Sequence, residues 1–289
     1  MSAVDLTLQL DARQPFLNDH RPGGLPLLGT AMGIELMARA AQQLDGNGAM
    51  SAWSIADVEI LDALVLDGPT ATVHVRAEQA EHSNGSIRCV VESRRVTGAP
   101  IRHFVGFVQR RQRETIVASV HDASASQPTD VSQDKIYRTF FHGPAFRVIR
   151  SARLLEAAMV CELSADLPPL SLPIDETLCA APRWIELCMQ TAGLLEIAVA
   201  SRMMIPRRIE RVDVVEAGGS AAAGPLVACA RRSMSPATGD AAFDIDLVDA
   251  RGVVLVRITG YHTRPLPYPA DPEAVRALHD ALGQAPTML

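Results

Sequence analysis

Residues 182–202 have the sequence PRWIELCMQTAGLLEIAVASR, and this stretch decides what kind of fold the chain can adopt. Apolar residues occupy most sides of it, which predicts a long helix buried in the protein interior. Pro182 suits the first position of that helix. A second stretch of this kind, TAMGIELMARAAQQL, spans residues 30–44, with Thr30 as its expected N-cap. A helix that is apolar all round needs a sheet wrapped around it.

Strand-like runs flank both helices and would form those sheets. In the first half of the chain they span residues 4–10, 53–64, 71–78, 86–96 and 101–110, with a hairpin turn at Asn84-Gly85. In the second half they span residues 146–154, 158–163, 208–215, 226–233, 243–248 and 253–261, with a turn at 249–252 and a short final helix at 271–282. The pattern predicts an α+β fold in which each half is one long helix surrounded by antiparallel strands.

A small, polar segment, VHDASASQPTDVSQD, separates the two halves. It predicts an N-terminal unit over residues 1–119, a linker over 120–134 and a C-terminal unit over 135–289 that carries the short final helix. The two units repeat a pattern of elements, with little obvious sequence identity between them.

The composition excludes several classes of protein. The chain has 289 residues, of which 48% are hydrophobic, and its net charge of -6 argues against a nucleic-acid-binding surface. No apolar run is long enough to span a bilayer, and the first residues lack a signal peptide's basic head and apolar core. The five cysteines are scattered without a CxxC pair, which indicates reduced thiols in a cytoplasmic protein and no zinc site. GxSxG, GxGxxG and P-loop motifs are also missing from the sequence.

His20 is the most informative polar residue. It precedes a Gly/Pro-rich turn, HRPGGLPLLG at residues 20–29, that leads directly into the first buried helix. A rigid turn there would hold the imidazole near a helix N-terminus, where backbone amides can bind a carbonyl oxygen or an anion. The alternative is an ordinary surface histidine in a loop.

Glu186 and Gln190 are four residues apart on the second buried helix, and Arg183 lies one turn before them. Together they form one polar stripe on an otherwise apolar helix, and such a stripe can simply face water. If it faces a cavity instead, burial would raise the pKa of the Glu186 carboxyl and suit it to donate a proton, with Gln190 orienting it. Gly193, one turn on, would leave room beside the stripe.

Two further features admit more than one interpretation. The sequence FFHGPAF at residues 140–146 can form a sharp Gly-Pro turn between aromatic residues. Alternatively, it is the ordinary beginning of a strand. Two arginine clusters are either solvated surface or a docking patch for an acidic partner: Arg110-Arg111-Arg113 and Arg207-Arg208-Arg211.

Taken together, these motifs resemble the polyketide synthase dehydratases over roughly residues 4–266. The family's HxxxGxxxxP motif is matched by DHRPGGLPLLGT, which supplies His20 and Gly24 but lacks the final proline. Its YGPxF motif is matched by HGPAF, with His142 in place of tyrosine, and its DxxxQ or DxxxH motif by Glu186 and Gln190. Segments such as FHGPAF and IELCMQTAGL are most similar to the corresponding segments of the dehydratases of polyunsaturated fatty-acid and enediyne-type iterative synthases.

The resemblance implies a tandem double hotdog fold and the loss of water from a β-hydroxyacyl thioester, which leaves an α,β-enoyl thioester. It implies His20 as the general base and Glu186 as the acid, drawn from different halves, with the Gly29 and Thr30 amides polarising the thioester carbonyl. His142, which adds a second candidate base or acid, is expected in substrate binding. The remaining residues expected to bind substrate are Gly143, Pro144, Phe146 and Gln190.

The resemblance also implies that no metal or redox cofactor takes part and that the substrate arrives on the phosphopantetheine of an acyl carrier protein. No nucleic acid or membrane partner is expected, and a homodimer stays open. Three alternatives on the same fold remain: a double-bond isomerase or oxa-Michael cyclase using the same two residues, a non-catalytic scaffold that docks a carrier-bound chain, and a thioesterase that releases free acid.

Overall fold

A computed structural model gives the structure of residues 2–46, 52–80, 85–95, 98–112, 115–118, 131–155, 158–173, 178–215, 222–234, 241–266 and 271–283. Asn84 and residues 120–130 of the predicted linker lie outside these ranges. Residues 131–134, the end of that predicted linker, form a short strand and the start of a helix, so the structured part of the second half begins before residue 135.

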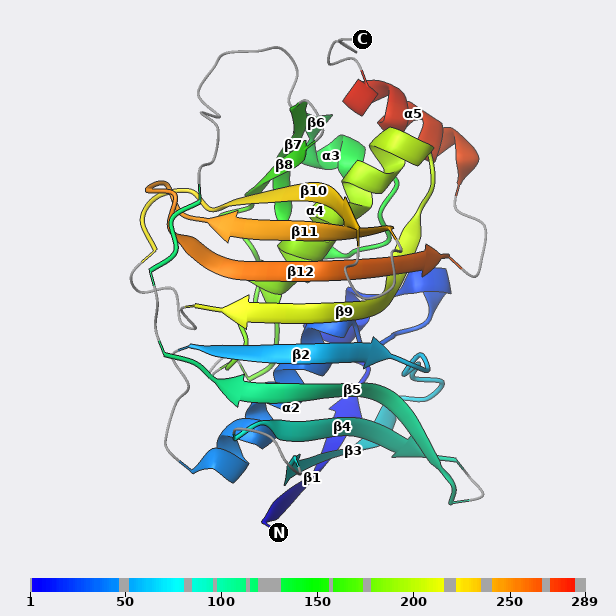
Figure 1. Ribbon diagram of the computed structural model, residues 1–289. Coiled ribbons are helices and arrows are strands. Elements are labelled where there is room, and N and C mark those ends of the chain that lie inside the picture. The colour runs from blue at the N-terminus through cyan, green and yellow to red at the C-terminus, as the bar shows by residue number, and fades with distance from the viewer. Residues whose placement is uncertain are drawn as a thin grey trace.

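One continuous antiparallel sheet of twelve strands runs through both halves (Figure 1). Its order is β1-β3-β4-β5-β2-β9-β12-β11-β10-β8-β7-β6, so each half contributes one contiguous block. The blocks join where β2 pairs with β9, from Trp53 opposite Val214 to Glu59 opposite Arg208. First-half strands are β1 (Ala3–Asp11), β2 (Trp53–Ile60), β3 (Thr70–Gln79), β4 (Ile87–Arg94) and β5 (Pro100–Arg110). Second-half strands are β6 (Val131–Ser132), β7 (Ile149–Leu155), β8 (Ala158–Leu163), β9 (Met204–Val214), β10 (Val227–Met234), β11 (Ala241–Val248) and β12 (Val254–Pro265).

The two predicted long helices, α2 (Thr30–Asp45) and α4 (Pro182–Ala200), lie behind this sheet in Figure 1, one in each half. Both are buried along most of their length, as a helix apolar on most sides requires. The residues that cap the C-termini of α2 and α4 are Gly46 and Ser201, each in the left-handed conformation that commonly closes a helix. The shorter helices are α1 (Pro15–Asn18), η1 (Pro22–Gly24), α3 (Gln133–Ile136), η2 (Pro144–Phe146) and α5 (Pro272–Gly283).

The predicted element types are confirmed, and the differences lie at their ends. Thr30 is the first residue of α2 rather than its N-cap; Gly29 occupies the cap position in an extended conformation. The run predicted as a strand from residue 146 begins only at Ile149, because η2 turns the chain first. The strand predicted over 53–64 ends at Ile60. β11 and β12 pair as the predicted hairpin.

The two helices are also joined to each other across the halves. Glu35 of α2 is fully buried, and its carboxylate accepts hydrogen bonds from the backbone amides of Cys179 and Ala180, at 2.7 to 3.0 Å. These amides come just before α4, so a side chain from the first half holds the start of the second helix. A carboxylate taken out of water needs such donors.

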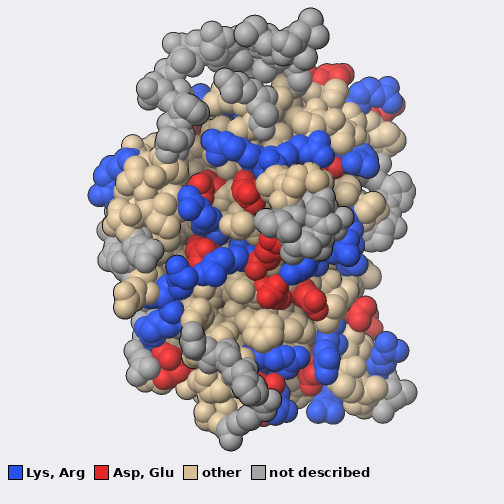
Figure 2. Space-filling model, viewed as in Figure 1, with Lys and Arg blue, Asp and Glu red and all other residues tan. Residues whose placement is uncertain are grey.

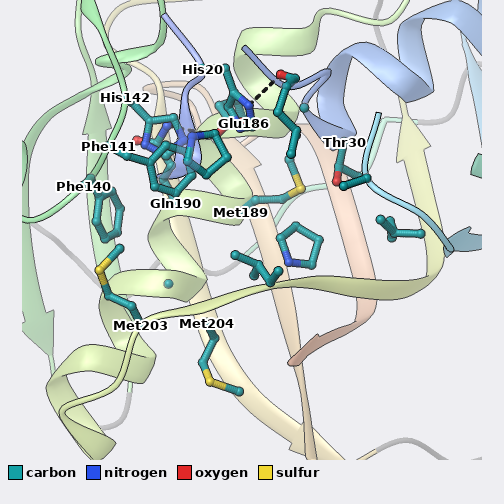
Figure 3. Close-up of a pocket in the computed structure, with 18 of the residues that line it drawn as sticks. His20, Thr30, Phe140, Phe141, His142, Glu186, Met189, Gln190, Met203 and Met204 are labelled. Carbon is teal, nitrogen blue, oxygen red and sulfur yellow. Dashed lines mark hydrogen bonds and ion pairs between the residues drawn. The ribbon is translucent and has the colours of Figure 1, made fainter. Parts of the chain in front are cut away.

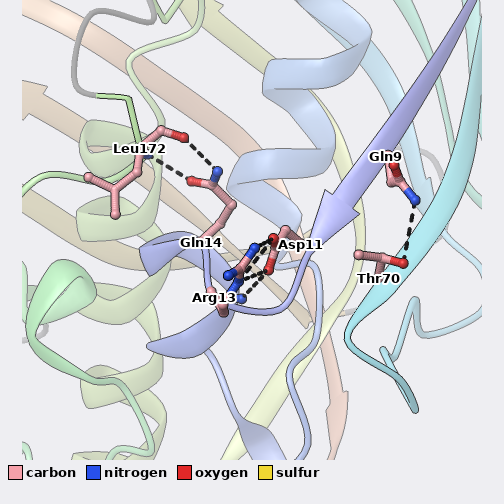
Figure 4. A network of polar contacts seen from close by, with 6 residues as sticks. All are labelled: Gln9, Asp11, Arg13, Gln14, Thr70 and Leu172. Carbon is pink, nitrogen blue, oxygen red and sulfur yellow. Dashed lines mark hydrogen bonds and ion pairs between the residues drawn. The ribbon is translucent and has the colours of Figure 1, made fainter.

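A second link between the halves lies near α1. The side-chain amide of Gln14 pairs with the backbone of Leu172, accepting from its N–H at 2.7 Å and donating to its C=O at 2.6 Å (Figure 4). The amide of Phe16 donates to the carbonyl of Leu170 at 3.0 Å. The segment before α4 is thus fastened to the segment that leads to His20.

The outer face of the sheet carries mixed charges, and Figure 2 shows acidic and basic side chains interspersed over it. Arg208 pairs with Asp57 at 2.7 Å, and Arg211 pairs with Asp213 at 2.8 Å. Arg110, in the other predicted cluster, pairs with Asp45. Three of the six cluster arginines therefore have an acidic partner within the chain, and Arg113 lies outside the described residues. The docking patch stays a prediction. No helix in the described ranges has the length and apolar character needed to cross a membrane.

Replacing Glu35 by alanine should destabilise the protein, because it leaves the amides of Cys179 and Ala180 buried without their acceptor. We expect the free energy of unfolding to fall by about 2–4 kcal/mol in urea denaturation. Glu59→Ala, at an exposed position of β2, is the matched control and should stay within about 0.5 kcal/mol of the parent. Equal stability of the two variants would show that Glu35 does not hold the halves together.

Candidate active site

His20 is held in a closed loop in front of α2. Its backbone carbonyl accepts from the amide of Leu27 at 3.0 Å, and the carbonyl of Leu27 accepts from the imidazole Nδ1 at 2.9 Å. The intervening turn uses Gly23 and Gly24, both at positive φ, which other residues rarely adopt. A carbonyl oxygen can only accept, so Nδ1 carries the ring proton and Nε2 keeps a free lone pair. The sequence prediction of a rigid turn is confirmed.

The imidazole lies against the N-terminus of α2. A Cβ atom at Gly29 would come within 3.2 Å of Nε2 of His20, so the absence of a side chain there is what lets the ring approach. The amides at the start of a helix have no partner within the helix, and they carry the positive end of its dipole. His20 and the first amides of α2 therefore face the same space.

The HGPAF segment docks onto the His20 loop through Asp19. The backbone amide of Gly143 donates to the carbonyl of Asp19, and that of Ala145 donates to its carboxylate, both at 2.7 Å. His20 and His142 form an antiparallel bridge between these segments. A Cβ at Gly143 would stand 2.6 Å from an Asp19 carboxylate oxygen, so only glycine allows this approach.

Glu186 reaches the same place from α4. It is buried, and its Oε1 accepts from Nε2 of Gln190 at 2.9 Å and lies 3.1 Å from Nε2 of His142. Gln190 is itself fixed, since its amide oxygen accepts from the hydroxyl of Tyr137 at 2.7 Å and its nitrogen donates to the carbonyl of Phe146 at 3.0 Å. The polar stripe of α4 therefore faces the interior, and Gln190 orients Glu186 as predicted.

These groups line one cavity of about 300 Å³ between the two halves. Figure 3 shows His20, His142 and Glu186 grouped at one end of it and Met203 and Met204 at the other. The remainder of the wall is mainly apolar, and it is made by Leu27, Leu28, Ile60, Val65, Phe104, Phe140, Phe141, Met189, Gly193, Ile197, Ile205, Pro206 and Tyr261, among others. The cavity suits an apolar chain with one polar, reactive end.

Burial lowers the pKa of His20 to about 4, with repulsion from His142 adding to the effect and the charge of Glu186 opposing it. A histidine with this pKa is neutral across the physiological range. Its Nε2 is therefore ready to accept a proton from a molecule in the cavity.

The pKa of Glu186 differs from the sequence prediction. Burial alone raises it, but the hydrogen bond and charge of His142, followed by His20 and Gln190, lower it below the ordinary value. The expectation of a raised pKa was wrong because the sequence could not show that two histidines surround this carboxyl.

Six of the nine residues predicted for the site line the cavity: His20, Gly29, Thr30, His142, Glu186 and Gln190. Gly143, Pro144 and Phe146 do not. Gly143 packs on Asp19, Pro144 is exposed at the start of η2, and Phe146 is buried with its ring centroid 6.0 Å from that of His20. In the structure these three shape the loop that carries His142, and their part in substrate binding stays a prediction.

Two residues of the site were missed, Asp19 and Tyr137. Asp19 lies next to His20 in NDHRPGG, where it resembles any polar loop residue. Tyr137 lies three residues before FFHGPAF, and nothing in the sequence distinguishes it there. Among the described residues, no group of three or more His, Cys, Asp or Glu side chains is placed to hold a metal ion. That the protein works without a cofactor stays a prediction.

Family models and solved structures agree on what this chain is similar to. Residues 2–94 match the model described as polyketide synthase dehydratase domain, and residues 117–273 match the one described as polyketide synthase dehydratase N-terminal domain.

Among the solved structures, a trans-AT PKS dehydratase domain from Brevibacillus brevis is 20% identical, with a TM-score of 0.76 over 91% of this chain and 94% of that one. The dehydratase domain of the polyketide PpsC from Mycobacterium tuberculosis is 18% identical, with a TM-score of 0.74 over 92% and 94%. An inactive mutant of the CurJ dehydratase, in which a histidine is replaced by phenylalanine, is 19% identical, with a TM-score of 0.72 over 94% and 93%. The predicted double hotdog fold is confirmed.

The depressed pKa of His20 makes stability depend on pH. The unfolded chain takes up a proton on this histidine near pH 6.5, whereas the folded protein does so only near 4, so stability falls as pH drops through this window. The variant His20→Asn keeps a donor toward Leu27 but cannot titrate. Between pH 7 and pH 4, we expect its free energy of unfolding to fall by up to about 3 kcal/mol less than that of the parent. Urea denaturation at several pH values measures this; identical pH dependence in the two proteins would contradict the buried, neutral His20.

Proposed function

The chain belongs to the polyketide synthase dehydratase family, and on that basis we propose that it eliminates water from a β-hydroxyacyl thioester carried by an acyl carrier protein. The observation that supports this most strongly is the meeting of His20 and Glu186, from different halves of the chain, at one end of an apolar cavity. The product is the α,β-enoyl thioester, and the enzyme class is a hydro-lyase.

His20 is the general base of this reaction. Its Nδ1–H is held by Leu27, so Nε2 is the atom that takes the α-proton of the substrate. The neutral ring that its low pKa provides is the form that can accept a proton. The inactive histidine-to-phenylalanine mutant of the CurJ dehydratase supports a histidine in this role.

The amides at the start of α2, at Gly29 and Thr30, receive the thioester carbonyl. As the α-proton leaves, negative charge develops on this oxygen, and backbone amides at a helix N-terminus stabilise it. Gly29 serves twice, because its missing side chain also gives His20 its place.

Glu186 delivers a proton to the β-hydroxyl, so that the C–O bond breaks and water leaves. The electrons of the Cα–H bond form the new double bond, and the α-proton is left on His20. His20 then releases this proton to solvent, and the acid is reprotonated from solvent before the next turnover. Gln190 and Tyr137 hold the carboxyl in place from behind. The apolar wall holds the acyl chain and keeps water away from the reacting end.

Incubation of the protein with a β-hydroxyacyl carrier protein, followed by mass spectrometry, tests the proposal. Loss of one water from the carried chain supports dehydration. Release of free acid would indicate a thioesterase. An isomerase or an oxa-Michael cyclase would instead act on a carried chain that already has a double bond, and would move that bond or close a ring with no change of mass. If the substrate is unchanged, the remaining alternative is a non-catalytic scaffold that docks the carrier-bound chain. The likeness to the polyunsaturated fatty-acid and enediyne-type enzymes, a homodimer and the cytoplasmic location stay predictions.

His20→Ala should slow the elimination by about 10²–10⁴-fold, because it removes the general base. Rates of product formation on the carrier-bound substrate measure this effect. His279→Ala, a partly exposed histidine of α5 far from the cavity lining, is the control and should keep the parent rate. A parent-like rate for His20→Ala would remove His20 from the reaction.

A further inference from the structure

His142 stands where the family's motif has a tyrosine, and its partner is Glu186. The Nε2 of His142 lies 3.1 Å from Oε1 of Glu186, and both side chains are more than nine-tenths buried. Both also line the cavity. A tyrosine in this position could not exchange a proton with a carboxyl near neutral pH, whereas an imidazole can.

The imidazole of His142 has one polar partner and is held toward it. Its Nδ1 is buried and meets no hydrogen-bonding group in the described part of the chain, so Glu186 is the group with which the ring can trade a proton. The ring stacks on Phe141, with centroids 4.3 Å apart and planes 27° from parallel. The backbone bridge to His20 fixes the segment itself.

Other ionisable groups face the pair from the elements packed around it. His20 lies closest, with ring centroids 5.5 Å from His142, and both it and His142 lower the pKa of Glu186. Tyr137 and Tyr261 are buried nearby, and Glu186 contributes to the elevation of their pKa values, so both stay neutral. The cavity lining also contains the charged residues Asp62 and Arg264. The carboxylate of Asp19 and the guanidinium groups of Arg147 and Arg183 form hydrogen bonds with the backbone of the HGPAF segment.

We propose that His142 and Glu186 share a single proton and act as one acid, with His142 storing the proton and Glu186 passing it to the β-hydroxyl. This deepens the proposed function and rests on it. In the open cavity the proton sits on Nε2 of His142 opposite an ionised Glu186. It moves to the carboxyl, leaving a neutral imidazole, and from there to the departing hydroxyl, which leaves as water.

The proton moves from His142 to Glu186 because an ion pair is unfavourable in a cavity that water has left. A buried ion pair is tolerated while water can reach it, but a substrate that fills the cavity expels that water and favours the neutral form of the pair. Because His142, His20 and Gln190 lower the pKa of Glu186, its carboxyl has lost its proton at neutral pH and needs a partner that supplies one. Two groups that interact this closely titrate as a pair, so the acid of the reaction is the pair.

The test is the pH dependence of kcat/KM for elimination in His142→Gln. The glutamine amide nitrogen reaches roughly the place of Nε2, so it can still donate to Oε1 of Glu186, but it cannot store a proton. We expect the parent to keep its activity through neutral pH. His142→Gln should be closest to the parent rate at the acid end of the profile and then lose about tenfold per pH unit once Glu186 has lost its proton, with KM little changed.

Two further variants make the outcome decisive. Glu186→Gln should be inactive over the whole pH range, and His279→Gln, in α5, should follow the parent profile. A parent-like profile for His142→Gln would overturn the shared proton, since a mere hydrogen-bond donor would then suffice. A loss that is equal at every pH would also overturn it, because His142 would be only structural. If the parent itself eliminates no water, the proposed function fails rather than this inference.

Discussion

Asp19 fastens the HGPAF segment of the second half to the loop that carries His20, and the whole site depends on this attachment. Its carbonyl and carboxylate hold the amides of Gly143 and Ala145, and the bridge between His20 and His142 follows from it. Because His20 comes from the first half and His142 and Glu186 from the second, neither half contains the whole cluster. The β2–β9 pairing and the Glu35 link give the large-scale alignment, and Asp19 sets the local one.

Burial of three ionisable groups in one cavity creates the chemistry. Desolvation and the neighbouring His142 lower the pKa of His20 and keep its ring neutral, as the proposed general base must be. Glu186 experiences the opposite balance, since the same histidines favour its charged form over the neutral form that burial alone would select. The same contacts therefore affect the pKa values of both the proposed base and the proposed acid.

The sequence revealed the long helices, the strands and the repetition of one plan, because apolar periodicity reports burial directly. It also identified His20, Glu186 and Gln190, which lie in motifs with a fixed place on predicted elements. It could not show that Gly143, Pro144 and Phe146 support a loop rather than line the cavity, because the two arrangements give the same sequence pattern. Tyr137 and Asp19 were missed for a related reason: their roles depend on contacts with residues 53 and 126 positions away. The pKa of Glu186 likewise depends on His142 and His20, which only the fold brings next to it.

His20 and Glu186 are proposed to act together in one elimination. The single-turnover elimination rate of the double variant His20→Ala/Glu186→Gln, compared with those of the two single variants, tests it most directly. Residues that act as a unit are strongly non-additive, so the double variant should be about as slow as the slower single variant. A double variant slower by the product of the two single losses would contradict the account, since the two residues would then contribute independently.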